Sequence, residues 1–271
     1  MKLAVVGTGL LGGAVARAAR ARGVASTIIG IEPDDNHANL AVEHGVIDER
    51  VHEVPADADL IVLCCPSDRV AEWVVTLGNG TVPVCDVGSV KAPIVRELKA
   101  LLGGELPACF VPSHPIAGSE KTGPLHAPVD LFSDRPVVIV PHAQLDGAAR
   151  TAVERFWAAL GGDVIAMDAE AHDRVLAVTS HLPHYLAYAF MLQVEEADLS
   201  LSGGGFSDFT RIAAANPDMW WRIFKMNRDA LMTALDGFEA NLADLRRALE
   251  AGDDGQGMAL LQRAARRRNQ L

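Results

Sequence analysis

The residues best suited to acid–base chemistry lie in the segment 113–120, Ser-His-Pro-Ile-Ala-Gly-Ser-Glu. His114 stands between the apolar run Ala108–Ser113, which predicts a strand, and a turn rich in proline and glycine. An imidazole titrates near pH ~6.5 and can therefore take up a proton at neutral pH. His114 is the candidate general base, with a structural turn histidine as the alternative.

The N-terminus carries a nucleotide-binding pattern. The apolar run Lys2–Val6, a glycine turn and the alanine-rich stretch Ala14–Arg22 follow one another as strand, turn and helix. Gly7 permits the tight turn, Gly9 lets the backbone approach a pyrophosphate, and Gly12 lets the helix pack on the strand. The phosphates would meet the free N–H groups at the helix start. The expected cofactor contacts in the turn are Gly7, Gly9, Leu10, Leu11 and Gly12.

Glu32 ends the β-branched run Thr27–Ile31, about 20 positions after the last glycine. A carboxylate at this place accepts hydrogen bonds from the adenosine ribose. Residues 33–35, Pro-Asp-Asp, offer no cation to a 2′-phosphate, which Glu32 would repel. The pattern therefore predicts NAD in preference to NADP. Pro66 and Ser89 complete the expected cofactor-binding residues.

The segment Asp86–Lys91, Asp-Val-Gly-Ser-Val-Lys, follows a predicted strand at its carboxyl end. Open α/β sheets bind ligands on that side, so Ser89 and Lys91 are expected to face the nicotinamide and the substrate. The alternative interpretation is a helix N-cap, which Ser and Asp favour.

Two segments in the second half of the chain also carry polar groups of interest. In Ser-His-Leu-Pro-His, His181 and His184 share one helical face, and Pro183 is expected to kink the helix. No third residue lies at a spacing typical of metal ligands, so we expect no metal. We expect these histidines to contact the substrate or to form buried hydrogen bonds. Arg211 follows a glycine-rich stretch and precedes Asn216-Pro217, a setting suited to clamping a carboxylate with a planar fork of donors.

Composition limits the class of protein. A net charge of −11 and a pI near 5.2 argue against nucleic acid as a partner and make binding of an anionic substrate depend on local cations. The four cysteines lie in strand-like runs without metal spacing, as expected for free thiols in a reducing compartment. The apolar stretch Val175–Val194 contains histidines and a proline, so no membrane segment is expected. An N-terminal signal peptide is the alternative for residues 2–16, but four glycines suit it poorly. The expected location is cytoplasmic.

Periodicity predicts an α/β protein with two domains. Apolar runs alternate with helical stretches up to residue 168, which indicates a parallel-rich sheet covered on both faces. The predicted strands beyond the first two are Leu60–Cys65, Val82–Val87, Ala108–Ser113, Pro136–Val140 and Val164–Met167. The predicted later helices are Ala169–Val194, Pro217–Ala251 and Asp254–Gln270. We therefore expect a Rossmann-type dinucleotide-binding domain over 1–168 and an all-helical substrate and dimerisation domain over 169–271.

A row of apolar side chains at alternating spacings of four and three runs along the predicted helix Pro217–Ala251. It consists of Leu231, Leu235, Phe238, Leu242, Leu245 and Leu249. The row is too short for a free coiled coil, so it packs either inside the chain or across a dimer. We expect a dimer in which the row packs both inside the chain and across the interface.

Taken together, the glycine turn, Asp86–Lys91, the His114-Pro-Ile-Ala-Gly-Ser-Glu run with Leu131-Phe132 after it, Ser180–His184 and Phe206–Arg211 closely resemble the prephenate/arogenate dehydrogenase family. The resemblance covers nearly the whole chain, in order. It implies an NAD(P)-binding domain, a helical dimerisation domain that forms a homodimer, and an active site between them.

The implied reaction is oxidative decarboxylation of prephenate, a cyclic dicarboxylate, to 4-hydroxyphenylpyruvate, with arogenate as the alternative substrate. His114 matches the family's catalytic histidine, and Ser89 would orient the same hydroxyl group. Arg211 matches the carboxylate-binding arginine. His181 would contact substrate, Trp220 would form a wall or lid, and Lys91 would touch substrate or cofactor. More distant alternatives are a 3-hydroxyacid dehydrogenase or imino-acid reductase and a non-catalytic NAD-sensing dimer.

Overall fold

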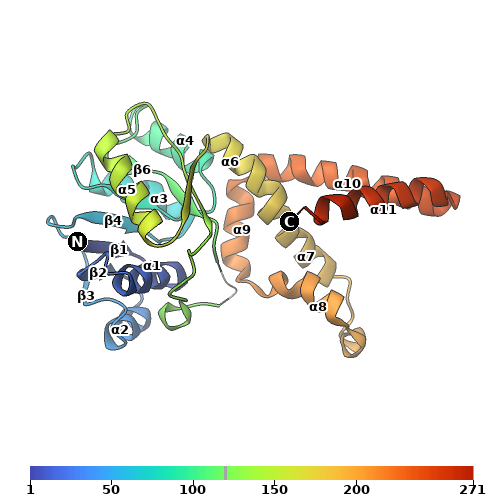
Figure 1. Ribbon diagram of the computed structural model, residues 1–271, viewed down its shortest axis with the longest axis horizontal. Helices are drawn as coiled ribbons and strands as arrows, with labels where there is room; N and C mark the ends of the chain where they lie inside the picture. The colour runs from blue at the N-terminus through green and yellow to red at the C-terminus, as the bar shows by residue number, and fades with distance from the viewer. Residues whose placement is uncertain (119–120, 271) are drawn as a thin grey trace.

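The computed structural model describes residues 1–118 and 121–270, in which a sheet-based part is followed by helices (Figure 1). The main sheet has six parallel strands in the order β3-β2-β1-β4-β5-β6. They are β1 Lys2–Val6, β2 Thr27–Ile31, β3 Glu49–Val51, β4 Leu60–Leu63, β5 Val84–Asp86 and β6 Phe110–Val111. This is the strand order of the Rossmann fold, whose ligand crevice lies where the order reverses, between β1 and β4. The predicted fold class is confirmed.

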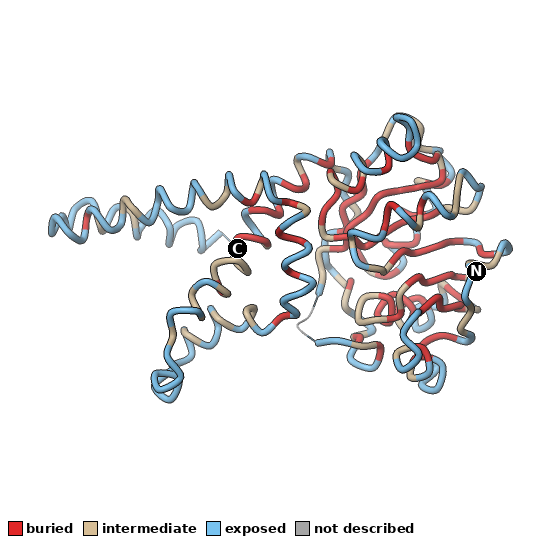
Figure 2. Tube along the Cα trace, turned by 180° about the vertical axis from the view of Figure 1, so that it is seen from behind, coloured by how far each residue is buried: buried red, intermediate tan, exposed pale blue. Residues whose placement is uncertain are grey.

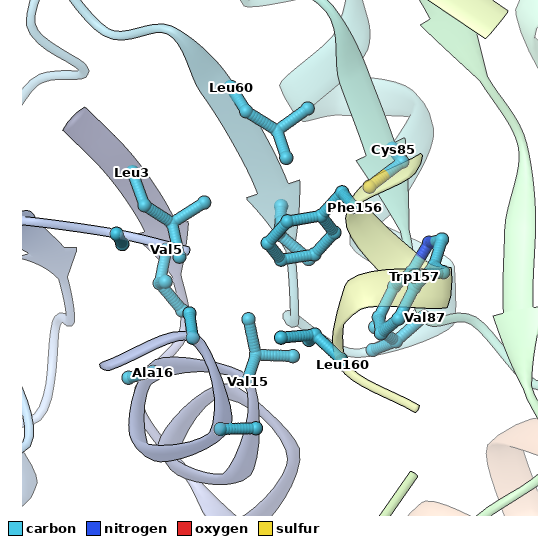
Figure 3. Packing of buried hydrophobic residues seen from close by; sticks show 14 of the residues in the cluster. Leu3, Val5, Val15, Ala16, Leu60, Cys85, Val87, Phe156, Trp157 and Leu160 are labelled. Carbon is cyan, nitrogen blue, oxygen red and sulfur yellow. The ribbon is translucent and has the colours of Figure 1, made fainter. Parts of the chain in front are cut away.

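Both faces of the main sheet are buried, as the continuous apolar strands predict. Successive residues of β1 enter opposite cores, with Val5 in one cluster and Val6 in the other. The covering helices are α1 Leu10–Ala21, α2 Asp35–Glu43, α3 Val70–Leu77, α4 Ala92–Leu101 and α5 Gly147–Ala159. Figure 3 shows the first core, where Val15 of α1 faces Leu160, the C-cap residue of α5.

A second sheet contains the strand that carries His114. It consists of β7 Ser113–Pro115, β8 Pro136–Ile139 and β9 Asp163–Ala166, with β7 antiparallel to β8. The single strand predicted over Ala108–Ser113 is therefore wrong. Pro112, which separates β6 from β7, has no N–H to donate, and its carbonyl accepts from the Val140 N–H at 2.9 Å. His114 is thus held within a strand, opposite Val138, and not on a turn.

The described chain after β9 is helical. The predicted helix Ala169–Val194 divides into α6 Ala169–Leu176, a π-helical turn Ala177–His181 and α7 Leu182–Met191. Pro183 lies in the first turn of α7, directly after the π-helical turn, where the regular α-helical hydrogen-bond pattern is interrupted. The predicted helix Pro217–Ala251 divides at Asn227 into α9 Pro217–Met226 and α10 Arg228–Ala251. The remaining helical segments are a 3-10 segment Glu196–Leu201, α8 Gly204–Thr210, a short 3-10 segment Arg211–Ala214, and α11 Asp254–Arg268.

The α10–α11 hairpin extends away from the sheet, and Figure 2 shows it exposed along most of its length. Of the predicted apolar row, Leu231 is buried, but Leu242 and Leu249 are 54% and 84% exposed. Only the start of the row therefore packs within the chain. None of the helices in the described part of the chain is long and apolar enough to cross a membrane.

Candidate active site

The glycine turn between β1 and α1 has the geometry that a phosphate group requires. Gly7 has a φ of +91°, and a Cβ there would lie 2.8 Å from the Cys64 carbonyl oxygen. A Cβ on Gly12 would lie 1.9 Å from the Gly7 carbonyl oxygen. Gly9 is the N-cap of α1, provides no side-chain cap, and has open space around its Cβ position. Backbone N–H groups at this helix start are thus accessible to an anion, which fits a dinucleotide pyrophosphate.

Glu32 follows β2 and lies against the same turn. Its carboxylate accepts from the backbone N–H of Thr8 at 2.7 Å and from that of Asp34 at 3.0 Å. The Thr8 hydroxyl also donates to it at 3.2 Å, so about one of the four lone-pair sites of a carboxylate remains for a ribose hydroxyl group. Residues 33–35 offer no cation, but Arg50 of β3, which lies further along the chain, donates to the backbone carbonyl of Glu32 at 3.0 Å. The short, polar edge strand β3 has no apolar run, so its place was not predicted.

Pro66 and Ser89 border the crevice side of the sheet. Pro66 follows β4 and precedes the 3-10 turn Ser67–Arg69. The Ser89 N–H donates to Ser67 Oγ at 3.1 Å, which brings the loop after β5 to the loop after β4. Both residues therefore lie at the carboxyl ends of neighbouring strands, as predicted.

Lys91 does not point toward a ligand. Its side chain is fully buried, and Nζ is hydrogen-bonded to the Asp86 carboxylate and to the Ser113 carbonyl. Asp86 also accepts from the N–H groups of Gly88 and Ser113. The expected substrate or cofactor contact of Lys91 is therefore corrected to a structural ion pair that holds β5 against β7. The N-cap alternative for Asp86 is also wrong, because α4 begins after Lys91 without a side-chain cap.

His114, in strand β7, is buried, with 8% of its surface exposed. Its Nδ1 lies 2.8 Å from Nε2 of His172, the fourth residue of α6. Burial lowers the pKa of His114 well below its usual value, and the neighbouring His172 and Lys91 side chains lower it further. The expectation of an ordinary imidazole pKa is corrected accordingly. His114 is neutral at pH 7, which is the protonation state of a general base.

His181 ends the π-helical turn and is 1% exposed. Its Nδ1 lies 2.9 Å from Nδ2 of Asn227, and its buried Nε2 has no hydrogen-bond partner in the described part of the chain. Burial lowers its pKa to about 4, although Asp173 acts in the opposite direction. The backbone of Ser89 lies close enough to raise this pKa slightly. The structure thus brings Ser89 and His181 together.

Trp220 and Arg211 lie near His184, the second histidine of the Ser180–His184 motif. The Trp220 ring stacks on His184, with centroids 3.5 Å apart, and its buried Nε1 lacks a hydrogen-bond partner among the described residues. Burial lowers the pKa of His184, and the positive charge of Arg211 lowers it further. Arg211 is exposed at the end of α8. His181, Trp220 and His184 therefore form one aromatic group, and Arg211 lies near enough to His184 to affect its pKa.

Sequence reasoning missed three polar residues that support the histidines: His172, Asp173 and Asn227. All three are buried. For Asn227 a signal was present, since asparagine inside an otherwise helical stretch favours a break between two helices. The His-Asp pair gave no comparable signal, because a helical pattern does not reveal which residues of another domain it will meet.

Two protein-family models match this chain over most of its length. Residues 15–166 match the model for the prephenate dehydrogenase nucleotide-binding domain, and residues 168–263 match the prephenate dehydrogenase dimerization domain. The chain belongs to the prephenate dehydrogenase family. The resemblance stated from the motifs is therefore confirmed, and the chain is an enzyme of this family.

Individual prephenate dehydrogenase relatives agree over almost the full length. A cyclohexadienyl dehydrogenase from Zymomonas mobilis is 35% identical and covers 93% of this chain and 89% of its own. The structure of prephenate dehydrogenase from Aquifex aeolicus with hydroxyphenyl propionate and NAD+ has a TM-score of 0.89 at 32% identity, covering 100% and 98%. The Synechocystis arogenate dehydrogenase structure has a TM-score of 0.80 at 26% identity, covering 100% and 99%.

Proposed function

We propose that this chain catalyses the NAD-dependent oxidative decarboxylation of prephenate to 4-hydroxyphenylpyruvate. The observation that carries the proposal is His114, a buried and neutral imidazole whose Nδ1 is occupied by His172, which leaves Nε2 for a substrate. The similarity to a prephenate dehydrogenase that binds NAD+ and hydroxyphenyl propionate supports the choice of substrate and cofactor.

In the proposed mechanism His114 Nε2 accepts the hydrogen bond and then the proton of the ring hydroxyl group. Bound NAD would accept the hydride from the ring carbon that bears this hydroxyl group. The ring carboxylate leaves as CO2, and its bonding electrons complete the aromatic ring. Ser89 lies near His181 and orients the hydroxyl group. The protein contributes a neutral base, a fixed orientation and a site from which water is largely excluded.

The two carboxylates of the substrate require cations in a chain of net charge −11. Arg211 is the proposed clamp for the carboxylate that is retained in the product, because a guanidinium offers paired donors. The buried Nε2 of His181 and Nε1 of Trp220 are two further donors without partners in the described structure. We assign both residues to the substrate site.

The proposed assembly is a homodimer formed through the C-terminal helices. The dimerization-domain match covers residues 168–263, and the outer half of α10 exposes the apolar row that a second copy would cover. All four cysteines are free thiols, which suits a reducing compartment such as the cytoplasm.

Steady-state rates with prephenate and arogenate, each with NAD and NADP, test the proposal. We expect the highest kcat/KM for prephenate with NAD. A much higher value for arogenate would replace the substrate and keep the reaction. No cofactor reduction with any of the four pairs would refute the proposed activity.

A further inference from the structure

Both histidines of the proposed site are connected to one dipeptide, His172-Asp173, in α6. His114 reaches it through the His172 ring, and His181 reaches it through the Asn227 side chain. His172 and Asp173 are 0% and 3% exposed, so water does not compete for these bonds.

The first connection fixes the proton on His114. The Asp173 carboxylate can only accept, so the His172 Nδ1, at 2.7 Å from Oδ1, carries a proton. Nε2 of a neutral His172 is then an acceptor, and His114 Nδ1 must donate to it across 2.8 Å. His114 therefore holds its proton on Nδ1 and presents a bare Nε2, which is the atom a general base needs.

Backbone groups of the nucleotide-binding part hold the Asp173 carboxylate in place. Oδ1 accepts from the Lys91 N–H at 2.8 Å, and Oδ2 accepts from the Ala92 N–H at 2.9 Å. These groups lie at the start of α4, where the helix dipole favours negative charge. The carboxylate is thus fixed by both parts of the chain, and its direction toward His172 is set.

The second connection fixes the proton on His181. Asn227 Nδ2 donates to the Asp173 backbone carbonyl at 2.8 Å, which identifies this atom as the amide nitrogen. The same nitrogen lies 2.9 Å from His181 Nδ1, so that ring atom accepts. A neutral His181 then carries its proton on Nε2, the buried atom that has no partner in the described chain.

We propose that His172, Asp173 and Asn227 are positioning residues that hold the two site histidines in opposite hydrogen-bonding roles. His114 is held as an acceptor toward the substrate hydroxyl group, and His181 is held as a donor toward a substrate oxygen. The inference rests on the proposed function for the meaning of these roles, but the proton positions themselves are properties of the protein alone.

Nitrogen-15 NMR of the full-length protein labelled at histidine tests the proton positions at pH 7 without any turnover. The His114→Asn and His181→Gln proteins assign the two signals by their disappearance. We expect the proton on Nδ1 of His114 and on Nε2 of His181. A doubly protonated His172 with the His114 proton on Nε2, or the opposite tautomer of His181, would overturn the inference whether or not the enzyme uses prephenate.

Two replacements of His172 separate positioning from packing. His172→Leu removes the acceptor, so we expect a mixture of His114 tautomers and a fall in kcat of about 100-fold. His172→Gln keeps a carbonyl acceptor and should recover at least about tenfold of that loss. Equal losses in both variants with an unchanged His114 tautomer would assign His172 to packing alone.

Asn227→Asp tests the second connection, because a carboxylate cannot donate to His181 Nδ1. The His181 proton should move to Nδ1, and KM for the substrate should rise more than kcat falls. His142→Gln is the matched control, since that ring bonds the Phe110 carbonyl outside the site. An unchanged His181 tautomer in Asn227→Asp would refute this part of the inference.

Discussion

Arg50 donates from Nε to the backbone carbonyl of Glu32, so a cation is anchored on the residue that is expected to select the cofactor. Its other nitrogens donate to the Asp35 carboxylate and to the Pro33 carbonyl. These bonds hold the guanidinium near the place where the adenosine is expected to bind. The proposed role of Glu32 in selecting NAD must therefore hold with a positive charge near its backbone.

Replacing Glu32 with Ser should reduce the preference for NAD over NADP, measured as the ratio of kcat/KM values. The ribose hydrogen bonds and the repulsion of a 2′-phosphate both disappear, while Arg50 remains to attract the phosphate. Adding Arg50→Ala should remove most of the gained activity with NADP. An NADP preference in the unmodified protein would contradict the role assigned to Glu32.

Truncating Arg211 to Ala should raise KM for prephenate much more than it lowers kcat, because the carboxylate is bound in both ground and transition states. A charge-assisted hydrogen bond contributes about 1.5–3 kcal/mol, so KM should rise roughly 10- to 100-fold. Arg211→Lys should recover only part, since an ammonium lacks the planar fork. The dissociation constant of NAD is the control, and an equal loss there would show that Arg211 supports the fold.

Lys91→Met should lower the free energy of unfolding by about 3–5 kcal/mol, because it leaves the buried Asp86 carboxylate without its cation. Urea unfolding measures this change. Lys99→Met, on the exposed face of α4, the helix that follows Lys91, is the matched control and should have little effect. Unchanged stability of the Lys91→Met protein together with a raised KM for prephenate would instead show that Lys91 contacts the substrate.

Charged residues in the exposed apolar row should separate the proposed dimer. Leu242→Glu combined with Leu249→Glu places two carboxylates where a second copy would pack. Light scattering after size exclusion should change from twice the chain mass to the chain mass. Leu101→Glu, at an equally exposed leucine of α4, should leave the mass unchanged. A dimer that survives the double substitution would place the interface elsewhere.

The sequence predicts the Rossmann sheet because its strands are continuous apolar runs between helices. It does not predict where β6 ends and β7 begins, because both fall in one apolar run and only Pro112 marks the change of sheet. The type and place of His114 follow from its motif, but its burial, and therefore its low pKa, depend on α6 packing from the other domain.

Lys91 shows the limit of motif reasoning most clearly. A lysine after a strand end can reach a ligand or a neighbouring carboxylate, and the two are equivalent in the sequence. Whether Lys91 contacts a ligand or a carboxylate depends on β7 lying beside β5, and this tertiary contact cannot be read from the sequence.

The pH dependence of kcat/KM follows from the burial of His114. Neutral imidazole is the active form, and its pKa in the free protein lies well below 6.5. The rate should therefore stay level as the pH falls to 6.5 and decline only at clearly lower pH. A decline centred near pH 7 would show that a different group limits the reaction.

The rate of NADH formation from prephenate by the His114→Asn protein tests the central claim most directly. General base catalysis contributes about 10²- to 10⁴-fold, so kcat should fall by that factor while KM for prephenate stays within about threefold. Turnover within about threefold of the unmodified protein would show that His114 is a structural residue and that the proposed mechanism is wrong.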